Sequence, residues 1–182
     1  MKKTSITLFL AVFYCLSSLY GADGQRSPIV INLIVDGSGA FTNARGEITS
    51  WVSNRLDQIL ANGDRITIWS AGQTAAVIYS DTISGDSDKE AAKRSIREIS
   101  PSGNYADFTG ALRGAASRQG SGINYNLVIC ASPAALSPVI SGPNSNLLRF
   151  SRIEEFSGWR AMVVGLNLDT RVINAASTFM GS

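Results

Sequence analysis

The stretch IVINLIVDGSGAF, residues 29–41, decides the fold of this 182-residue chain. Its first seven residues are apolar except for Asn32, and most are β-branched, which is typical of a strand buried on both faces. The DGSGA segment that follows, residues 36–40, has the glycine and polar residues of a loop. The sequence therefore predicts a buried strand over 29–35 with a polar loop at its carboxyl end.

Short apolar runs alternate with helical patterns along the rest of the chain. This alternation predicts one α/β domain over residues 23–182, with a doubly wound, mostly parallel sheet and helices on both faces. The runs at 65–70 and 75–79 are joined by a short link, so they predict a hairpin that adds one antiparallel edge strand. Further strands are expected at 126–130 and 161–166, and helices at 47–60, 87–99, 108–117, 147–156 and 169–180.

The first 22 residues have the pattern of a secretory signal peptide. Lys2 and Lys3 precede an apolar run at 6–16 that is too short to span a bilayer comfortably. We therefore expect an exported protein, periplasmic or extracellular. An uncleaved membrane anchor and a lipoprotein attached through Cys15 are the alternatives, and Tyr14 before that cysteine is a poor match to a lipidation site.

Cleavage after residue 22 would change the charge and the cysteine content. It removes two lysines, so Lys and Arg fall from 16 to 14 and equal the 14 Asp and Glu. A neutral chain gives no reason to expect nucleic acid as a partner, and no membrane span would remain. Cys130 would be left as the single cysteine, and its place in the apolar run LVIC predicts a small core residue.

Several segments, in order, resemble the von Willebrand factor A family. The strand and loop IVINLIVDGSGAF resemble the family's opening D-x-S-x-S motif, and RITIWSAGQTAAVIY resembles its second and third strands. NYADFTGALRGA resembles its second metal-site loop, NLVICASPAAL its fourth strand and WRAMVVGLN its fifth. The resemblance covers residues 28–180 and implies a doubly wound fold that binds protein partners, in many members through Mg²⁺ or Mn²⁺.

The resemblance also implies where a metal would bind, and this chain departs from that pattern. Asp36 and Ser38 match the first two family ligands, whereas Ala40 replaces the second serine. Alignment on the Ala–Leu pair puts Ala106 at the threonine position, and the final aspartate falls near Ser132. Hard cations need several oxygen ligands, so we expect a degenerate site without tightly bound metal. Weak Mg²⁺ or Mn²⁺ binding stays open, with Asp36 and Ser38 as residual candidates.

Four polar residues are the best candidates for binding a ligand: Asp36, Ser38, Asp107 and Thr109. Asp107 and Thr109 lie close to Ala106, and Thr109 would be the family threonine if the alignment shifts by three residues. We expect protein–protein recognition through loops 36–45, 102–110 and 131–146, at the carboxyl edge of the sheet. Asp36 could instead only cap its own loop and the helix that follows. A metal-dependent adhesion domain is the nearest alternative function.

The composition argues against an enzyme. The chain has no histidine, which excludes Ser–His and Cys–His catalysis and histidine-ligated metals. The G-x-G of residues 37–39 lacks a third glycine, because Thr42 stands at that position, so it is a weak dinucleotide signal. No catalytic residue is assigned, and an α/β enzyme or nucleotide-binding protein is the alternative from another class.

The helix expected at 87–99 is rich in charged residues of both signs. Asp86, Ser87 and Asp88 are expected to cap its amino end. Its basic residues interleave with acidic ones, which predicts a solvated helix face rather than a phosphate-binding patch. Core packing is the default for the tryptophans, with Trp69 and Trp159 as possible rim residues. The basic residues are Lys89, Lys93, Arg94 and Arg97.

Overall fold

The computed structural model describes residues 26–118, 123–131 and 159–165. Within these ranges the chain forms a five-stranded sheet in the order β3-β2-β1-β4-β5. β1 pairs in parallel with β2 on one side and β4 on the other, β4 pairs in parallel with β5, and β2 and β3 are antiparallel. The strands are β1 (Val30–Asp36), β2 (Arg65–Ala71), β3 (Ala75–Thr82), β4 (Asn124–Cys130) and β5 (Trp159–Gly165).

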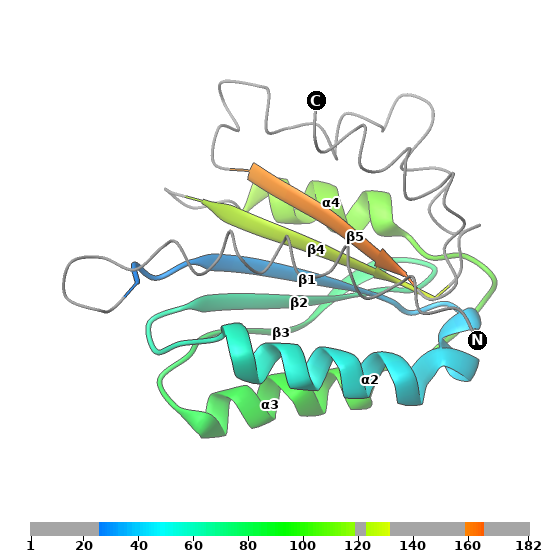
Figure 1. The fold of residues 1–182 in the computed structure, drawn as a ribbon. Helices are drawn as coiled ribbons and strands as arrows, with labels where there is room; N and C mark the ends of the chain where they lie inside the picture. Colours follow the sequence, from blue (N-terminus) through cyan, green and yellow to red (C-terminus); the bar gives the residue numbers. More distant parts are fainter. Residues whose placement is uncertain (1–25, 119–122, 132–158, 166–182) are drawn as a thin grey trace, which may run out of the picture.

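In the described residues, three helices cover the two faces of this sheet. α2 (Ala40–Ile59) and α3 (Asp86–Arg97) lie on one face, and α4 (Phe108–Ser117) lies on the other (Figure 1). The predicted doubly wound, mostly parallel sheet with one antiparallel edge strand and helices on both faces is confirmed. Because β1 is central and the chain winds outward from it in both directions, the order reverses between β1 and β4, where open α/β sheets bind ligands.

The larger core lies between the sheet and the pair α2 and α3. Leu33 and Val35 of β1 point into it and are fully buried, as the alternation of side chains along a strand requires. Ile66 and Ile68 of β2 join them from the neighbouring strand. α2 contributes a stripe of residues at helical spacing, all at most 2% exposed: Phe41, Ile48, Val52 and Leu56.

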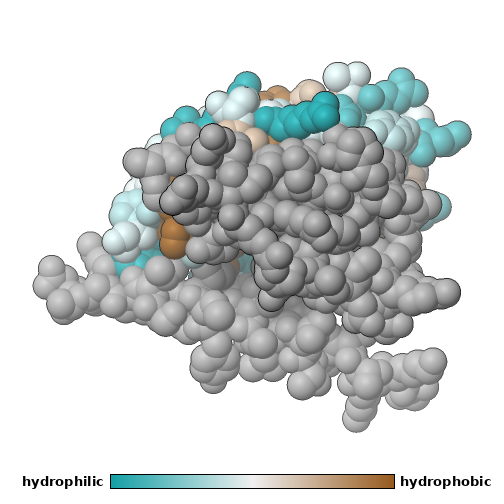
Figure 2. Space-filling model, turned by 90° about the horizontal axis from the view of Figure 1, so that it is seen from above, coloured by the Kyte–Doolittle hydropathy of each residue, from teal (hydrophilic) through white to brown (hydrophobic). Residues whose placement is uncertain are grey.

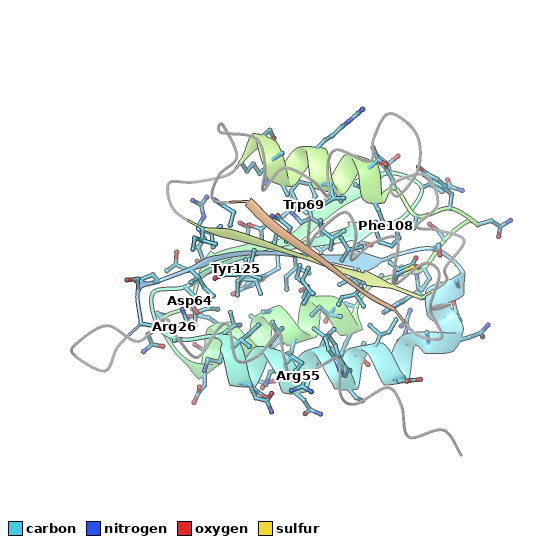
Figure 3. The ribbon with its side chains drawn as sticks, turned by 45° about the horizontal axis from the view of Figure 1, so that its top comes forward. Arg26, Arg55, Asp64, Trp69, Phe108 and Tyr125 are labelled. Atoms are coloured by element: carbon cyan, nitrogen blue, oxygen red, sulfur yellow. The ribbon has the colours of Figure 1, made fainter. Side chains whose placement is uncertain are left out.

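The α4 face of the sheet has a second, smaller core. Trp69 of β2 is 6% exposed and lies between the sheet and α4 (Figure 3). A Cβ atom at Gly114 would collide with the Trp69 ring, so this glycine lets α4 approach the strand. The guanidinium of Arg118 stacks 5.1 Å from the ring centroid. Trp69 is therefore a core residue, and the alternative that it lies at the rim is wrong.

Asn32, the polar exception in β1, belongs to a row of polar side chains across the α4 face. Its amide nitrogen donates to Oδ1 of Asn126 on β4 at 3.0 Å. Thr67, its partner on β2, shares a hydrogen bond of 3.0 Å with the Ser80 hydroxyl on β3. A shift of register by one residue would separate these pairs, so the row helps to fix the register of β1 against β4 and of β2 against β3.

α2 begins seven residues earlier than the sequence predicted. The expected helix was 47–60, with 36–45 as a loop, but the helix begins at Ala40. Phe41 explains the difference, because its ring is fully buried and anchors the first turn in the core. Gly46 resembles a helix boundary in sequence, yet it lies inside the helix with open space around it. Most of the expected binding loop 36–45 is therefore helical.

One basic residue of α3 does not belong to a solvated face. Lys93 is 7% exposed, and its ammonium bridges Asp57 of α2 and Glu90 of α3, the latter at 2.8 Å. Hydrogen bonds from Lys93 to these carboxylates raise the pKa of the lysine above its ordinary value. The prediction of a wholly solvated face is wrong at this position, because the lysine ties the two helices together.

Two of the three predicted caps, Asp86 and Ser87, are the first residues of α3 itself, and the amino end of the helix is capped by Asp88. Its carboxylate Oδ2 accepts hydrogen bonds from the Ser84 backbone N–H at 2.7 Å and from the Ser84 hydroxyl at 2.5 Å. The Gly85 N–H, at the N-cap, donates to the same oxygen at 3.2 Å. These bonds, led by the one from the Ser84 side chain, lower the pKa of Asp88.

The amino edge of the sheet is fastened by an ion pair between Arg26 and Asp64 (Figure 3). The guanidinium binds both carboxylate oxygens, one of them at 2.7 Å, and also donates to the Ile59 carbonyl at 2.6 Å. Asp64 is fully buried and accepts two further bonds, from the backbone N–H groups of Ile29 and Ala61. The clamp joins the start of β1 to the connection between α2 and β2.

Some predictions fall on residues outside the described ranges. These are the signal peptide over 1–22, Cys15, Ser132, the expected binding loop 131–146 beyond its first residue, and the helices at 147–156 and 169–180. Among the residues that the structure describes, no helix is both long and apolar enough to cross a bilayer. Cys130 is buried, as its apolar neighbours predicted.

Candidate functional site

Asp36 lies at the carboxyl end of the central strand, where the strand order reverses. Its side chain is fully buried, and each carboxylate oxygen accepts one backbone hydrogen bond. Oδ1 accepts from the Ser38 N–H at 2.9 Å, and Oδ2 accepts from the Ala131 N–H at 3.0 Å, just after β4. Asp36 thus closes its own loop and ties the end of β1 to the exit of β4.

The loop after Asp36 also bonds to two other segments of the chain. The Gly37 N–H donates to the Ala71 carbonyl at 2.8 Å, at the end of β2. The Gly37 carbonyl accepts from the Ser102 N–H at 3.0 Å, and the Gly39 N–H donates to the Gly103 carbonyl at 2.7 Å. A Cβ at Gly39 would lie 2.9 Å from that carbonyl, so only glycine allows this approach.

Asp107 holds the same edge from the other side of the sheet. It is the N-cap of α4, where Oδ1 accepts from the Gly110 N–H at 2.8 Å, and Oδ2 accepts from the Ala75 N–H at 3.3 Å. Its own N–H donates to the Gly72 carbonyl at 2.9 Å. Asp107 therefore joins the hairpin between β2 and β3 to the start of α4.

The two hydroxyl candidates, Ser38 and Thr109, are buried at 3% and 9% exposure. Thr109 lies in the first turn of α4, and its Oγ1 has no hydrogen-bond partner among the described residues. In the described part of the chain, neither hydroxyl forms a hydrogen bond with another of the four candidates. Ser38 bonds to Asp36 through its backbone N–H. The structure thus gives Asp36 and Asp107 clear roles in holding loops, and direct contact of the four residues with a ligand stays a prediction.

The described donors fit a tightly held Mg²⁺ or Mn²⁺ poorly. Both oxygens of Asp36 already accept backbone hydrogen bonds, and the side chains of Ala40 and Ala106 have no oxygen. Within residues 26–118, 123–131 and 159–165, no three carboxylates or cysteines gather as a metal cluster would. Ser132 lies outside these ranges. The absence of a tight metal stays a prediction.

Sequence reasoning missed the most exposed aromatic residue of this edge. Tyr105 is 44% exposed and lies in the loop between α3 and α4, two residues before Asp107. The sequence showed it within the segment NYADF, but apolar periodicity assigns no exposure to a residue in a loop. Its position next to glycine and asparagine, at the carboxyl edge of a parallel sheet, was the available signal.

Comparisons with known proteins agree on the fold. No protein-family model and no curated protein sequence matches the chain. A von Willebrand factor type A protein from Catenulispora acidiphila matches with a TM-score of 0.63 and 15% identity, over 86% of this chain and 38% of that one. The SpRpn10 VWA domain matches with a TM-score of 0.60 and 11% identity, over 86% of this chain and 84% of that one.

A third solved structure is the conserved hypothetical protein BatB from Bacteroides thetaiotaomicron. It matches with a TM-score of 0.58 and 16% identity, over 75% of this chain and 66% of that one. The chain thus spans 38% and 66% of the lengths of two of these proteins. At such identities the likeness concerns the fold alone, and it shows that the chain has a von Willebrand factor A-like fold.

Proposed function

We propose that this chain is an exported binding module that recognises a protein partner through the loops at the carboxyl edge of its sheet, without a tightly bound metal. Three described segments meet at this edge: 37–39, 71–75 and 102–107. The resemblance to the von Willebrand factor A family supports protein recognition at this place. The N-terminal sequence supports export to the periplasm or the cell exterior, whereas the residues before Cys15 give little support for lipid anchoring.

The cross-bonded loops at the carboxyl edge carry this proposal. Asp36 and Asp107 accept backbone hydrogen bonds from three different loops and a helix end, so their carboxylates are used to hold the edge in shape. A surface that is already ordered loses little conformational entropy when a partner binds. Such an edge suits recognition by shape and hydrogen bonding, and it needs no metal to organise it.

The second candidate is a metal-dependent adhesion domain, and one observation favours it. Asp36 is fully buried, and no described Lys or Arg forms an ion pair with it. A buried carboxylate without a counter-charge is costly, and a divalent cation would supply one. We favour the metal-free form because Ala40 and Ala106 supply no oxygen ligand where the family has a serine and a threonine. We further propose that the chain is not an enzyme, because it has no histidine and the described residues offer no convergent acid–base set.

The proposal can be tested with two matched asparagines. Asn104 is exposed in the loop at the carboxyl edge, and Asn62 is exposed at the opposite edge, before β2. Each is replaced in turn by a photo-crosslinking amino acid in the full-length chain, which is expressed in its native cells and irradiated. We expect one discrete protein adduct from position 104, none from position 62, and the same yield with and without EDTA in envelope preparations.

The opposite results would overturn the proposal. An adduct from position 62 alone would place the partner at the wrong edge, and no adduct from position 104 would remove the binding function from these loops. Loss of the 104 adduct in EDTA, with recovery on adding Mg²⁺ or Mn²⁺, would favour the metal-dependent candidate.

A further inference from the structure

Two large hydrophobic side chains are exposed in the described part of the chain, and they lie at opposite edges of the sheet. Tyr105, at 44% exposure, precedes α4 at the carboxyl edge. Ile123, at 37% exposure, precedes β4 at the amino edge. The view from above shows a described surface that is mainly hydrophilic, with isolated hydrophobic spots (Figure 2). Among the described residues, Tyr105 is therefore the exposed aromatic side chain at the carboxyl edge.

The loop around Tyr105 is fastened on both sides. Before it, Ser102 and Gly103 bond to the glycine loop after β1, at 3.0 Å and 2.7 Å. After it, the Asp107 N–H bonds to the Gly72 carbonyl. Gly103 has a φ of 68°, a conformation that favours glycine, and the Gln73 side chain packs against it. Only three residues separate these fixed points, so the ring of Tyr105 projects from an ordered backbone.

The three described segments around Tyr105 contain no charged residue, and the guanidinium of Arg45 beside them donates to the Ile99 carbonyl at 2.7 Å. Residues 37–43, 71–75 and 100–106 contain no Asp, Glu, Lys or Arg. Asp36 is fully buried, and Asp107 is partly buried with both of its carboxylate oxygens bonded to backbone N–H groups. In sequence, residues 131–148, which follow β4, are uncharged as well.

This combination matches the chemistry of rigid protein-binding loops. Tyrosine supplies a large amphipathic contact surface at low entropic cost, and serine, glycine and asparagine supply adaptable hydrogen bonds. The segment PSGNY, residues 101–105, consists largely of these residues. Nucleic acids and anionic membranes require Lys and Arg at the contact, and the three described segments have none.

We infer that Tyr105 is the central anchor of this edge, and that it inserts its ring into an uncharged, partly apolar pocket on a folded protein partner. The inference rests on the proposed function and specifies its partner. Buried aromatic anchors dominate the affinity of such interfaces. Binding without opposed charges has little electrostatic steering, so it depends weakly on salt.

The experiment measures the yield of the position 104 adduct in three further variants. Tyr105→Ala should lower the yield at least about tenfold, as expected for loss of a hot spot. Tyr105→Phe keeps the ring and should retain at least about a third of the yield. Ile123→Ala is the matched control, an exposed hydrophobic residue at the other edge, and should leave the yield unchanged. Raising NaCl from about 50 to 500 mM in envelope preparations should change it less than about threefold.

The outcomes separate the anchor from the binding function. If the 104 adduct persists in Tyr105→Ala at more than half its yield, the anchor is wrong and the proposed function stands. A fall of more than about tenfold at high salt would show a charged interface and overturn the neutral pocket. If no adduct forms from position 104 in the chain that keeps Tyr105, the proposed function and this inference fail together. An unchanged melting temperature of Tyr105→Ala excludes unfolding as the cause of a lower yield.

Discussion

Asp36 and Asp64 are both fully buried aspartates, yet they lie at opposite edges of the sheet and are held in different ways. Asp64 pairs with the Arg26 guanidinium and accepts two backbone N–H groups besides. Asp36 accepts two backbone N–H groups and has no cationic partner among the described residues. The amino edge is therefore held by an ion pair, and the carboxyl edge is held by hydrogen bonds from backbone N–H groups to a carboxylate.

The difference indicates what each edge does. A buried, paired charge resists change, because removing either partner leaves the other unpaired in the interior. Backbone hydrogen bonds organise loops and leave the exposed surface uncharged. We interpret the Asp64 edge as a structural clamp and the Asp36 edge as an ordered platform for binding.

The largest expected effect is that of Asp64→Ala. It leaves Arg26 without its carboxylate and two backbone donors without an acceptor, so the free energy of unfolding should fall by about 3 to 5 kcal/mol. Urea denaturation measures this value. Asp81→Ala removes an exposed aspartate and should change stability by less than about 0.5 kcal/mol. Equal effects of the two substitutions would contradict the clamp.

Asp36→Ala should cost less, about 2 kcal/mol, because two backbone N–H groups lose their acceptor but no ion pair is broken. Asp36→Asn keeps one acceptor oxygen and should cost less still. The same denaturation experiment checks both values. Asp36→Ala should also weaken the position 104 adduct, since the loops are no longer held. A loss of stability as large as that of Asp64→Ala would remove the contrast between the two edges.

Thr109→Val tests the unpartnered hydroxyl near the carboxyl edge. Removing a buried hydroxyl that makes no hydrogen bond should raise the free energy of unfolding by about 1 kcal/mol. Thr67→Val is the matched control, and it should lower stability because it loses the bond to Ser80. If Thr109→Val also destabilises the protein, the hydroxyl has a partner in a segment outside the described ranges.

A third aspartate, Asp88, extends the comparison to a partly exposed site. Hydrogen bonds from Ser84 lower its pKa, so its contribution to stability is present above the ordinary carboxyl pKa of about 3.9 and is lost as the pH falls through the lower folded value. NMR titration of the carboxyl carbon should show the lowered pKa. Ser84→Ala should move it back toward the ordinary value, and an unmoved titration would contradict this cause.

The smallest expected effect is that of divalent cations. Millimolar Mg²⁺ or Mn²⁺ should leave the melting temperature unchanged, because a ligand stabilises the native state only if it binds there. Thermal unfolding with and without the ions measures this directly. A clear rise in the melting temperature that disappears in Asp36→Ala would show that a metal binds at the carboxyl edge. Asp64 would then be paired with an arginine and Asp36 with a metal ion.

Sequence patterns predicted the sheet well, because apolar β-branched runs such as 29–35 are long and local. With the family resemblance they placed Asp36 and Asp107 at the carboxyl edge of the sheet, where both hold loops. They missed the start of α2 at Ala40, since Gly46 resembles a boundary and only tertiary burial of Phe41 extends the helix. They missed the burial of Lys93, because its partner Asp57 belongs to another helix. The exposure of Tyr105 depends on how three distant loops pack, which no single stretch encodes.

The Arg26 clamp has a mechanical consequence. It fixes the chain at the amino end of β1, and Asp36 lies at the other end, about 20 Å away along the strand. A partner that held the carboxyl edge while the chain was pulled from its N-terminal side would load β1 along its axis. The parallel hydrogen-bond ladders to β2 and β4 would then bear the force together, as in shear, rather than opening one bond at a time.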